Sequence, residues 1–430
     1  MSDAHTDEWM ISVDDHLIET PTVWTDRLPA RYRDTGPRFI RDDQGPTWMF
    51  EDVRRPIGGS VTNGALWPPS RRPPSFEPLD FEHIDPACFD PVARTKAMDE
   101  DHVLASLMFP TLPGFAGSLF ARAKDKALAL LCVQAYNDWI IEEWSDGVPG
   151  RFIPLAIVPL WDGRLAAAEA ERAIAKGARG ISFSMGPEYL GLPSIHDPDR
   201  FWDPLFATLG ESGVPLCTHL GTGAAGITGG AEGPDVFRQG VPVGIDVVKT
   251  QLAGQDTLLD WLYADHFQRF PGLKLVLSEN GIGWIPAVLQ VADWMFEMSR
   301  DRVPQPGEEG NDPMGTEEER AAAKAAIEAR AEAAKTAKMP SEIFREHVFG
   351  CFIHDPMGLK LVREIGIDNV MIETDFPHTA SWFPFSLDKA QDSIAHLTEQ
   401  ERWKVLRGNA ERIFSFTPAE IPVGAATVAE

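Results

Sequence analysis

The sequence has no long hydrophobic run, and this absence bounds what the chain can be. No apolar stretch approaches the about 18 residues that a membrane-spanning helix needs, so we expect no membrane span. The N-terminal stretch MSDAHTDEWMISVDD contains neither a basic head nor an apolar core, so it does not predict a secretory signal. We therefore expect a cytoplasmic protein.

Cysteine is scarce, with four residues in a chain of 430 and no Cys-x-x-Cys spacing. Cys132, Cys217 and Cys351 lie in apolar stretches, where a free cysteine packs as a small hydrophobic residue. The sequence therefore predicts that these three are reduced core residues, and it assigns no role to Cys88.

Basic residues are also few, because 39 Lys and Arg stand against 65 Asp and Glu, for a formal net charge of −26. This charge repels the phosphates of nucleic acids and of anionic membranes, so neither is expected as a partner. A small anionic substrate is still allowed, because four arginines could form a local basic patch. They are Arg55, Arg71, Arg72 and Arg94.

No Gly-x-Gly-x-x-Gly turn of a dinucleotide-binding sheet follows the first predicted strand, and apolar β-branched segments alternate with stretches of helical period. Eight alternations of apolar strands with helices favour a parallel (β/α)8 barrel of the TIM type over an open doubly wound sheet. The predicted strands are Ile11–Asp15, Val103–Phe109, Phe152–Pro159, Arg179–Ser184, Val214–Leu220, Lys274–Glu279, His347–Ile353 and Asn369–Thr374. The predicted helices are Ala121–Trp144, Leu165–Lys176, Trp202–Glu211, Val247–Phe267, Pro286–Met298, Met357–Ile365 and Thr398–Phe414.

Two segments interrupt this alternation. Residues 41–94 follow the first strand and combine proline clusters with aromatic residues, which predicts an ordered cap over the barrel mouth. Residues 301–340 begin with an acidic, flexible stretch and continue as a polar helix, typical of a solvated excursion or of an arm contacting a second subunit. We expect one domain over residues 1–415 with a tail over 416–430, assembled as a homodimer or larger homo-oligomer.

Acidic and imidazole side chains stand at the ends of the predicted strands. Asp14 and His16 end the first strand, His219 ends the fifth, and Asp375 follows the eighth. Residues two apart on a strand face the same side, so Asp14 and His16 can reach one ion together. Because the active site of a (β/α)8 barrel lies at the carboxyl ends of its strands, these side chains should converge there. Their chemistry predicts one divalent ion, with Zn²⁺ as the first candidate and Mn²⁺ as the second.

Four further residues are candidates at the same edge of the barrel or near it. Glu279 ends the sixth strand and is expected as an acid/base or orienting group. His378 follows Asp375 by three residues and either contacts the substrate or holds the loop by a hydrogen bond. His354 follows the seventh strand with the same two possibilities, and Arg94 either pairs within the fold or binds the substrate.

These residues resemble the amidohydrolase superfamily, in particular its amidohydrolase-2 branch, which includes aminocarboxymuconate-semialdehyde decarboxylase and the γ-resorcylate-type decarboxylases. VDDHLIETP is similar to the Glu-x-His motif of the first strand in those decarboxylases, with Asp14 in the glutamate position and His16 in the histidine position. THLGTG is similar to the fifth-strand motif and is carried by His219. ETDFPH is similar to the eighth-strand motif and is carried by Asp375, and the resemblance spans roughly residues 10–415 outside the two insertions.

The chain departs from the family pattern in its first and sixth strands. Asp14 and His16 replace the commoner His-x-His pair, and Glu279 stands where the decarboxylases usually have a histidine. The fourth strand, GISFS, offers no lysine that could bridge two metal ions as a carbamate, so a mononuclear site is expected.

The resemblance implies a metal-dependent decarboxylase of a small aromatic or unsaturated carboxylic acid, in which Asp375 delivers a proton to the carbon that loses CO₂. The alternative is a metal-dependent hydrolase, in which Asp375 takes a proton from water that attacks an amide, an ester or a C–C bond next to a carbonyl. An inactive binding or scaffold protein is disfavoured, because no ligand position has been lost.

Overall fold

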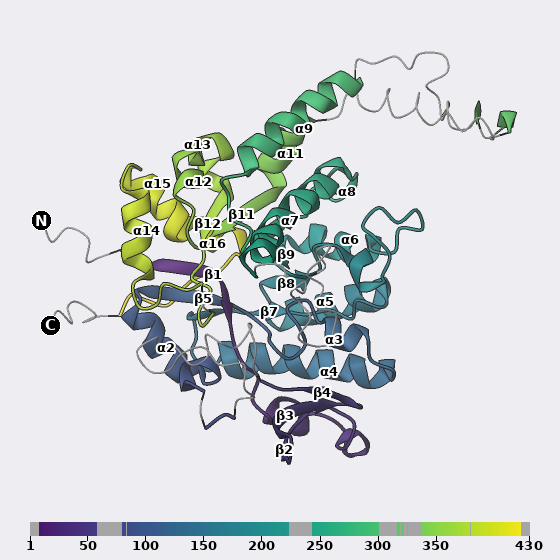
Figure 1. The fold of residues 1–430 in the computed structure, drawn as a ribbon, viewed down its shortest axis with the longest axis vertical. Coiled ribbons are helices and arrows are strands. Elements are labelled where there is room, and N and C mark those ends of the chain that lie inside the picture. Colours follow the sequence, from purple (N-terminus) through teal and green to yellow (C-terminus); the bar gives the residue numbers. More distant parts are fainter. Residues whose placement is uncertain are drawn as a thin grey trace, which may run out of the picture.

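The computed structural model describes residues 8–57, 80–82, 84–222, 243–300, 316–318, 320–321, 325, 338–378 and 380–422. Parallel strands form its centre and helices surround them (Figure 1). The parallel strands are β1 (Met10–His16), β5 (Val103–Phe109), β6 (Phe152–Ile153), β7 (Leu155–Ala156), β8 (Gly180–Phe183), β9 (Leu216–His219), β10 (Leu275–Ser278), β11 (Val348–Phe352) and β12 (Val370–Ile372). Within each of two sheets, every strand pairs in parallel with the next one in the chain.

The two parallel sheets join into a closed barrel. β6 and β7 form one extended segment that is interrupted at Pro154, which has no N–H group to donate. Between β12 and β1, Asp375 N donates to Asp14 O (2.9 Å) and His16 N donates to Phe376 O (2.8 Å). The described residues thus form the parallel TIM-type barrel that the alternation predicts, with all its strands buried on both faces.

Alternate strand residues fill the inside of the barrel, as is usual for this fold. The inner core cluster unites Ile11, Val13, Ala105, Leu107, Phe109, Ile153, Leu155, Cys217, Val276, Phe349, Cys351, Met371, Ala410, Ile413 and Phe414. The last three come from α16 and the residue after it, so the C-terminal helix packs onto one end of this core.

Helices cover the outside of the barrel and bury their apolar faces in a second, larger core cluster. Their bounds are α1 (Thr22–Thr25), α2 (Pro91–Glu100), α3 (Ser118–Ala121), α4 (Lys126–Trp139), α5 (Gly163–Lys176), α6 (Asp203–Ser212), α7 (Val243–Tyr263), α8 (His266–Arg269), α9 (Ile285–Arg300), α11 (Pro340–His347), α12 (Pro356–Lys360), α13 (Val362–Ile365), α14 (Ser386–Ile394), α15 (Glu399–Trp403) and α16 (Asn409–Ile413). None of the described helices combines the length and the apolar character needed to cross a bilayer.

The predicted helix over residues 121–144 is wrong at its start, because a loop separates α3 from α4. Asp125 caps α4 by accepting hydrogen bonds from the backbone N–H groups of Ala127 and Leu128, so the helix begins at Lys126. The predicted helix over residues 398–414 is also interrupted, because a π-turn over residues 404–408 separates α15 from α16.

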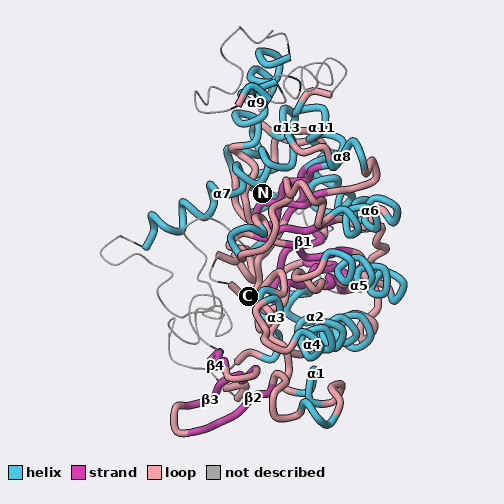
Figure 2. The backbone as a smooth tube through the Cα atoms, turned by 90° about the vertical axis from the view of Figure 1, so that its right-hand side faces the viewer, coloured by secondary structure: helices cyan, strands magenta, loops and turns pink. Residues whose placement is uncertain are grey.

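A small antiparallel sheet follows β1 within the predicted cap region. It contains β2 (Arg38–Asp42), β3 (Gly45–Phe50) and β4 (Val53–Arg55), and it lies beside α1 and α4 (Figure 2). Aromatic rings connect it to the barrel helices: Trp48 packs on Trp24 with ring centroids 5.6 Å apart. Residues 58–79 fall outside the described part of the chain, so a cap over the mouth stays a prediction.

The second predicted insertion lies between α9, which ends at Arg300, and α11, which begins at Pro340. Its predicted helix falls almost entirely outside the described residues. The single domain over residues 1–415 and the tail from residue 416 also stay predictions.

All four cysteines are buried, and none of them forms a disulfide in the described part of the chain. The predicted core position is therefore confirmed for Cys132, Cys217 and Cys351, which belong to the two core clusters. Cys88, which the sequence left unassigned, is buried in the same way and packs in the outer cluster.

Candidate metal centre

A shift of register in β1 turns the side chains of Asp14 and His16 into the barrel. Ile11 and Val13 belong to the inner core, so a regular strand would next point Asp15 inward. The pairing of β1 with β5 shifts register between Ser12 and Asp15, as at a β-bulge. As a result, Asp14 and His16 both join the central cluster of side chains.

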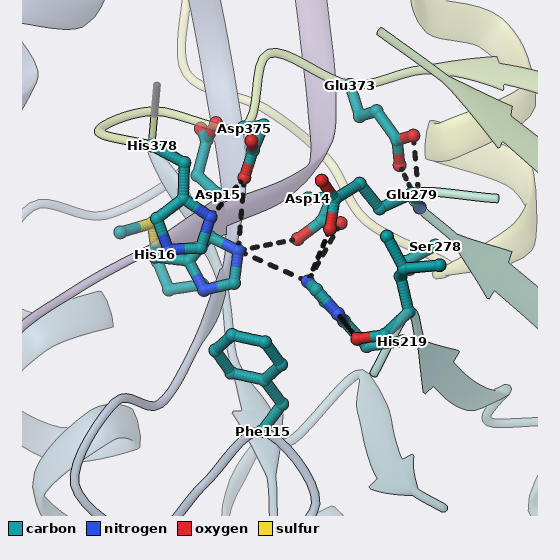
Figure 3. Close-up of polar contacts among 12 residues, drawn as sticks. Asp14, Asp15, His16, Phe115, His219, Ser278, Glu279, Glu373, Asp375 and His378 are labelled. Atoms are coloured by element: carbon teal, nitrogen blue, oxygen red, sulfur yellow. Dashed lines mark hydrogen bonds and ion pairs between the residues drawn. The ribbon is translucent and has the colours of Figure 1, made fainter. Parts of the chain in front are cut away.

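Asp14, His16 and His219 meet at the carboxyl ends of β1 and β9 (Figure 3). The Nε2 atom of His16 lies 3.5 Å from Asp14 Oδ1, and the Nε2 atom of His219 lies 3.3 Å from Asp14 Oδ2. The two Nε2 atoms are 3.2 Å apart. All three residues are buried, so one small cation could contact an atom of each.

Asp375 and His378 complete the cluster from the loop after β12 (Figure 3). Asp375 Oδ1 lies 3.2 Å from His16 Nε2 and 2.8 Å from His378 Nδ1. The His378 ring stacks on the His16 ring with centroids 3.7 Å apart. Asp375 has a φ of 54°, in the left-handed region that few residues other than glycine adopt.

The bonding of Asp14 and His219 fits a metal ion. Both carboxylate oxygens of Asp14 are buried and accept no hydrogen bond from the described part of the chain, whereas buried carboxylates normally do so unless they bind a cation. His219 Nδ1 donates to the carbonyl of Leu220 at 2.7 Å. This bond leaves the lone pair of Nε2 directed at Asp14, which is how a histidine ligand is usually oriented.

Burial shifts the pKa values of the cluster toward the uncharged forms of its side chains. Burial raises the pKa of the Asp14 carboxyl well above its usual range, and the carboxylates of Asp375 and Glu279 raise it further. Burial likewise raises the pKa of Asp375, although His219 opposes the shift. Burial lowers the pKa of His16 well below its usual value, which favours the neutral imidazole that binds metals. A divalent cation would oppose both carboxylate shifts, because its positive charge favours the ionised forms.

Glu279 lies at the edge of the cluster, directly after β10. Its Oε2 atom is 3.8 Å from His219 Nε2, and its side chain is 16% exposed, so it borders the space into which a substrate would enter. Burial raises the pKa of Glu279 to about 7, with a further contribution from the Asp375 carboxylate. A group with that pKa can give or take a proton near neutrality.

Three residues of the site were missed in the sequence. The Phe115 ring lies 4.1 Å from the His219 ring and 4.7 Å from the His16 ring, between centroids, and forms an aromatic wall of the site. Asp15 and Glu373 are buried carboxylates beside the predicted ligands. The sequence signal for Asp15 and Glu373 was their position near a candidate ligand, in VDDH and in ETDFPH. Phe115 had no such signal.

Arg94 is placed behind the site. Its side chain is fully buried, its Nε donates to Ala87 O (2.6 Å), and its Nη2 donates to His16 O. Its guanidinium also lies 4.5 Å from the centre of the Phe376 ring. These contacts pair Arg94 within the fold, where it holds the His16 backbone, and a contact of Arg94 with the substrate stays a prediction.

His354 is exposed and does not join the cluster in the described contacts. Its ring lies 5.6 Å from the Trp382 ring, centroid to centroid, in the loops after β11 and β12. The next residue, Asp355, accepts hydrogen bonds from the backbone N–H groups of Ile282 and Gly283 and so ties this loop to the one after β10.

A parallel barrel with histidines and carboxylates gathered at the carboxyl ends of its strands is the architecture of metal-dependent barrel enzymes. The amidohydrolase family profile matches residues 64–416, and the chain belongs to this family of enzymes. It is 25% identical to the γ-resorcylate decarboxylase of Polaromonas sp. (strain JS666 / ATCC BAA-500) over 351 residues, which are 75% of this chain and 86% of that protein.

Two crystal structures share the fold. An amidohydrolase from Mycobacterium avium subsp. paratuberculosis K-10 superposes with a TM-score of 0.67 at 22% identity, over 95% of this chain and 98% of that one. The 5-carboxyvanillate decarboxylase of Novosphingobium aromaticivorans, complexed with manganese and 4-hydroxy-3-methoxy-5-nitrobenzoic acid, superposes with a TM-score of 0.59 at 16% identity, over 96% of this chain and 98% of that one. The TIM-barrel architecture is therefore common to all three.

Proposed function

We propose that this enzyme is a metal-dependent decarboxylase of a small aromatic or unsaturated carboxylic acid. The observation that carries the proposal is the buried cluster of Asp14, His16 and His219 beside Asp375. Support comes from the relative at 25% identity, which is a γ-resorcylate decarboxylase, and from the aromatic wall that Phe115 supplies.

Asp14, His16, His219 and Asp375 would hold one divalent ion, which would supply a Lewis acid that binds and orients the substrate carboxylate. Zn²⁺ remains the first candidate on ligand chemistry alone. Mn²⁺ gains support because the structurally similar 5-carboxyvanillate decarboxylase was crystallised with manganese, and because half of the ligands here are carboxylates. The described β8, GISF, contains no lysine, in keeping with a single ion.

Asp375 is the group that we assign to proton transfer. The Nδ1 atom of His378 lies 2.8 Å from Asp375 Oδ1. The other carboxylate oxygen of Asp375, Oδ2, is therefore the atom from which a proton would pass to the ring carbon of the substrate. As that C–H bond forms, the electron pair of the C–C bond returns to the ring and CO₂ leaves. Phe115 would stack on the substrate ring and exclude water from this step.

A hydrolase is the second candidate, and one observation favours it. Glu279 replaces the histidine that the sequence comparison leads one to expect, and its pKa of about 7 suits a general base. Such a base at the edge of the site could take a proton from water and direct it at an ester, an amide or a C–C bond next to a carbonyl. The ligand residues would serve either reaction.

Isotope exchange separates the two reactions. Metal-loaded enzyme would be incubated with a panel of hydroxybenzoates in ¹³C-bicarbonate, and with aryl esters and amides in H₂¹⁸O. The proposal predicts entry of ¹³C into the carboxylate of at least one hydroxybenzoate, with none for the His219→Ala variant. Entry of ¹⁸O into an ester or amide product, without any ¹³C exchange, would establish the hydrolase instead.

The proposed partners are limited to a small carboxylate substrate and further copies of the chain. The net charge of −26 disfavours nucleic acid and anionic membranes. A homodimer or larger homo-oligomer and a cytoplasmic location remain part of the proposal.

A further inference from the structure

Glu373 is a buried acid next to the site that no step of the proposed reaction uses. It follows β12 by one residue and is 2% exposed. Its side chain points across the barrel mouth toward Glu279 (Figure 3). Both of its carboxylate oxygens lie 3.1 Å from the backbone N of Glu279 and accept its hydrogen bond.

The backbone that receives this bond is in an unusual conformation. Glu279 has a φ of 59°, in the left-handed region, which a residue with a Cβ adopts only where its surroundings hold it. Without this turn, the chain leaving β10 would continue as extended strand and the Glu279 side chain would point elsewhere. The conformation thus decides whether the Glu279 carboxylate reaches the cluster.

A second carboxylate fixes the other end of the same turn. Asp355 Oδ2 accepts hydrogen bonds from Ile282 N (2.8 Å) and Gly283 N (2.6 Å). Glu373, directly after β12, therefore holds the start of the segment from Glu279 to Gly283. Asp355, in the loop after β11, holds the end of this segment. Among the described hydrogen bonds of this segment, the one that Glu279 N donates to Glu373 is at the left-handed residue itself.

We propose that Glu373 is a positioning residue, which holds Glu279 in its left-handed conformation and so keeps the Glu279 carboxylate beside His219. The hydrogen bonds of the Glu373 side chain in the described part of the chain go to the Glu279 amide. Its effect on the reaction therefore passes through Glu279. The kinetic consequence rests on the proposed function, in either its decarboxylase or its hydrolase form.

The side-chain chemistry defines two informative substitutions. Glu373→Gln keeps one carbonyl oxygen that can accept from Glu279 N, whereas Glu373→Leu keeps the approximate volume and removes the acceptor. Removing a residue that orients an active-site group typically lowers activity by about ten- to a hundredfold. We expect that loss in kcat for Glu373→Leu, with metal content unchanged, and partial recovery in Glu373→Gln.

The decisive test repeats both substitutions in a Glu279→Gln background. If Glu373 acts through Glu279, Glu373→Leu should change kcat by less than about twofold there, because effects that pass through one residue are not additive. An equal loss in both backgrounds would overturn the proposal. Asp101→Asn is the matched control, because Asp101 is a buried carboxylate that accepts one backbone N–H, from Ser386, outside the cluster. It should leave kcat unchanged.

Amide hydrogen exchange tests the positioning without any substrate. The Glu279 amide should exchange at least about tenfold faster in Glu373→Leu than in the wild type and at an intermediate rate in Glu373→Gln, because its acceptor is lost or weakened. Unchanged protection of this amide in a folded Glu373→Leu protein would overturn the proposal. Faster exchange in a protein that shows neither ¹³C nor ¹⁸O incorporation would support the positioning and reject the proposed function alone.

Discussion

Among single residues, Asp375 matters most to the proposed chemistry, because it could bind the metal ion and also transfer the proton. Its Oδ1 atom contacts two imidazoles, His16 and His378, and burial raises its pKa well above the usual range. A residue that only binds metal has to stay ionised, whereas a proton carrier needs a pKa that its surroundings can shift in both directions. Burial raises the pKa of Asp375, and a bound cation would lower it.

Asp375→Asn should separate binding from proton transfer. The asparagine keeps the size and one coordinating oxygen but cannot carry the proton. We expect it to retain most of the bound metal and to lose at least about a hundredfold in kcat, the low end of general acid–base contributions. Metal content and kcat would be measured on the same preparation. Full metal with near-normal kcat would reject the role and direct attention to Glu279.

The sequence predicted the residues whose identity alone shows their chemistry. Asp14, His16, His219 and Asp375 were singled out because histidine and aspartate at strand ends form a recognisable pattern, and the fold brings them together. Phe115 could not be found, because a phenylalanine in a loop carries no such mark and only the fold brings it against His219. Nor could the residue-by-residue pattern show that Arg94 faces the His16 backbone, since only the path of α2 behind β1 decides this.

At the scale of the element, the junction of β1 with β12 positions the site. Asp15 Oδ1 accepts hydrogen bonds from the Thr374 hydroxyl (2.6 Å) and from Phe376 N (2.8 Å). Ser12 Oγ accepts from Thr374 N (2.9 Å). These bonds tie the irregular end of β1 to the start of the Asp375 loop. They thereby fix the two strands that carry three of the four proposed ligands.

Asp15→Asn should loosen this junction. The amide group brings donors to the position of Oδ2, which now accepts from the Ser106 hydroxyl, so this buried hydrogen bond has to reverse or is lost. We expect a loss of about 1–3 kcal/mol in the free energy of unfolding and a roughly ten- to hundredfold weaker metal affinity. Urea denaturation and metal titration would measure the two effects.

Glu169→Gln is a suitable comparison for Asp15→Asn. Glu169 is equally buried and accepts from the Asn137 side chain, but it lies on α5 outside the barrel mouth. It should lower stability without changing metal affinity. Equal metal affinity in Asp15→Asn and wild type would show that the junction does not position the ligands.

The strands were easier to predict than the helices. Each of the eight predicted strands overlaps an observed strand, because buried parallel strands form short apolar runs that little else resembles. Helix boundaries depended on single capping residues such as Asp125, and the shift of register in β1 depends on pairing with β5, which is distant in sequence. Such long-range contacts leave no periodic signal.

At the scale of the whole molecule, buried carboxyl groups dominate the electrostatics. Burial raises the pKa of Glu19 and of Asp101 to about 7, and both lie outside the metal cluster. The carboxyl groups of Asp14 and Asp375 shift in the same direction. The folded protein without metal therefore binds protons that the unfolded chain would already have released.

These extra protons of the folded state determine how its stability changes with pH. Because the folded pKa values of Glu19 and Asp101 are raised, the metal-free protein should lose stability as the pH rises from about 4 to about 7. Glu19 alone would contribute up to about 3 kcal/mol to this decline, because burial raises its pKa to about 7. Urea denaturation at several pH values would measure the slope, and Glu19→Gln should flatten it. An unchanged slope in Glu19→Gln would contradict the assignment.

The central claim is that Asp14, His16, His219 and Asp375 surround one divalent ion. An anomalous difference map from crystals grown with Mn²⁺ tests it most directly. We expect one peak per chain. It should lie roughly 2.0–2.3 Å from a ring nitrogen of His16, from a ring nitrogen of His219 and from a carboxylate oxygen of Asp14. The peak should disappear in the His219→Ala variant. A peak elsewhere in the barrel, two adjacent peaks, or none at full Mn²⁺ saturation would contradict the account.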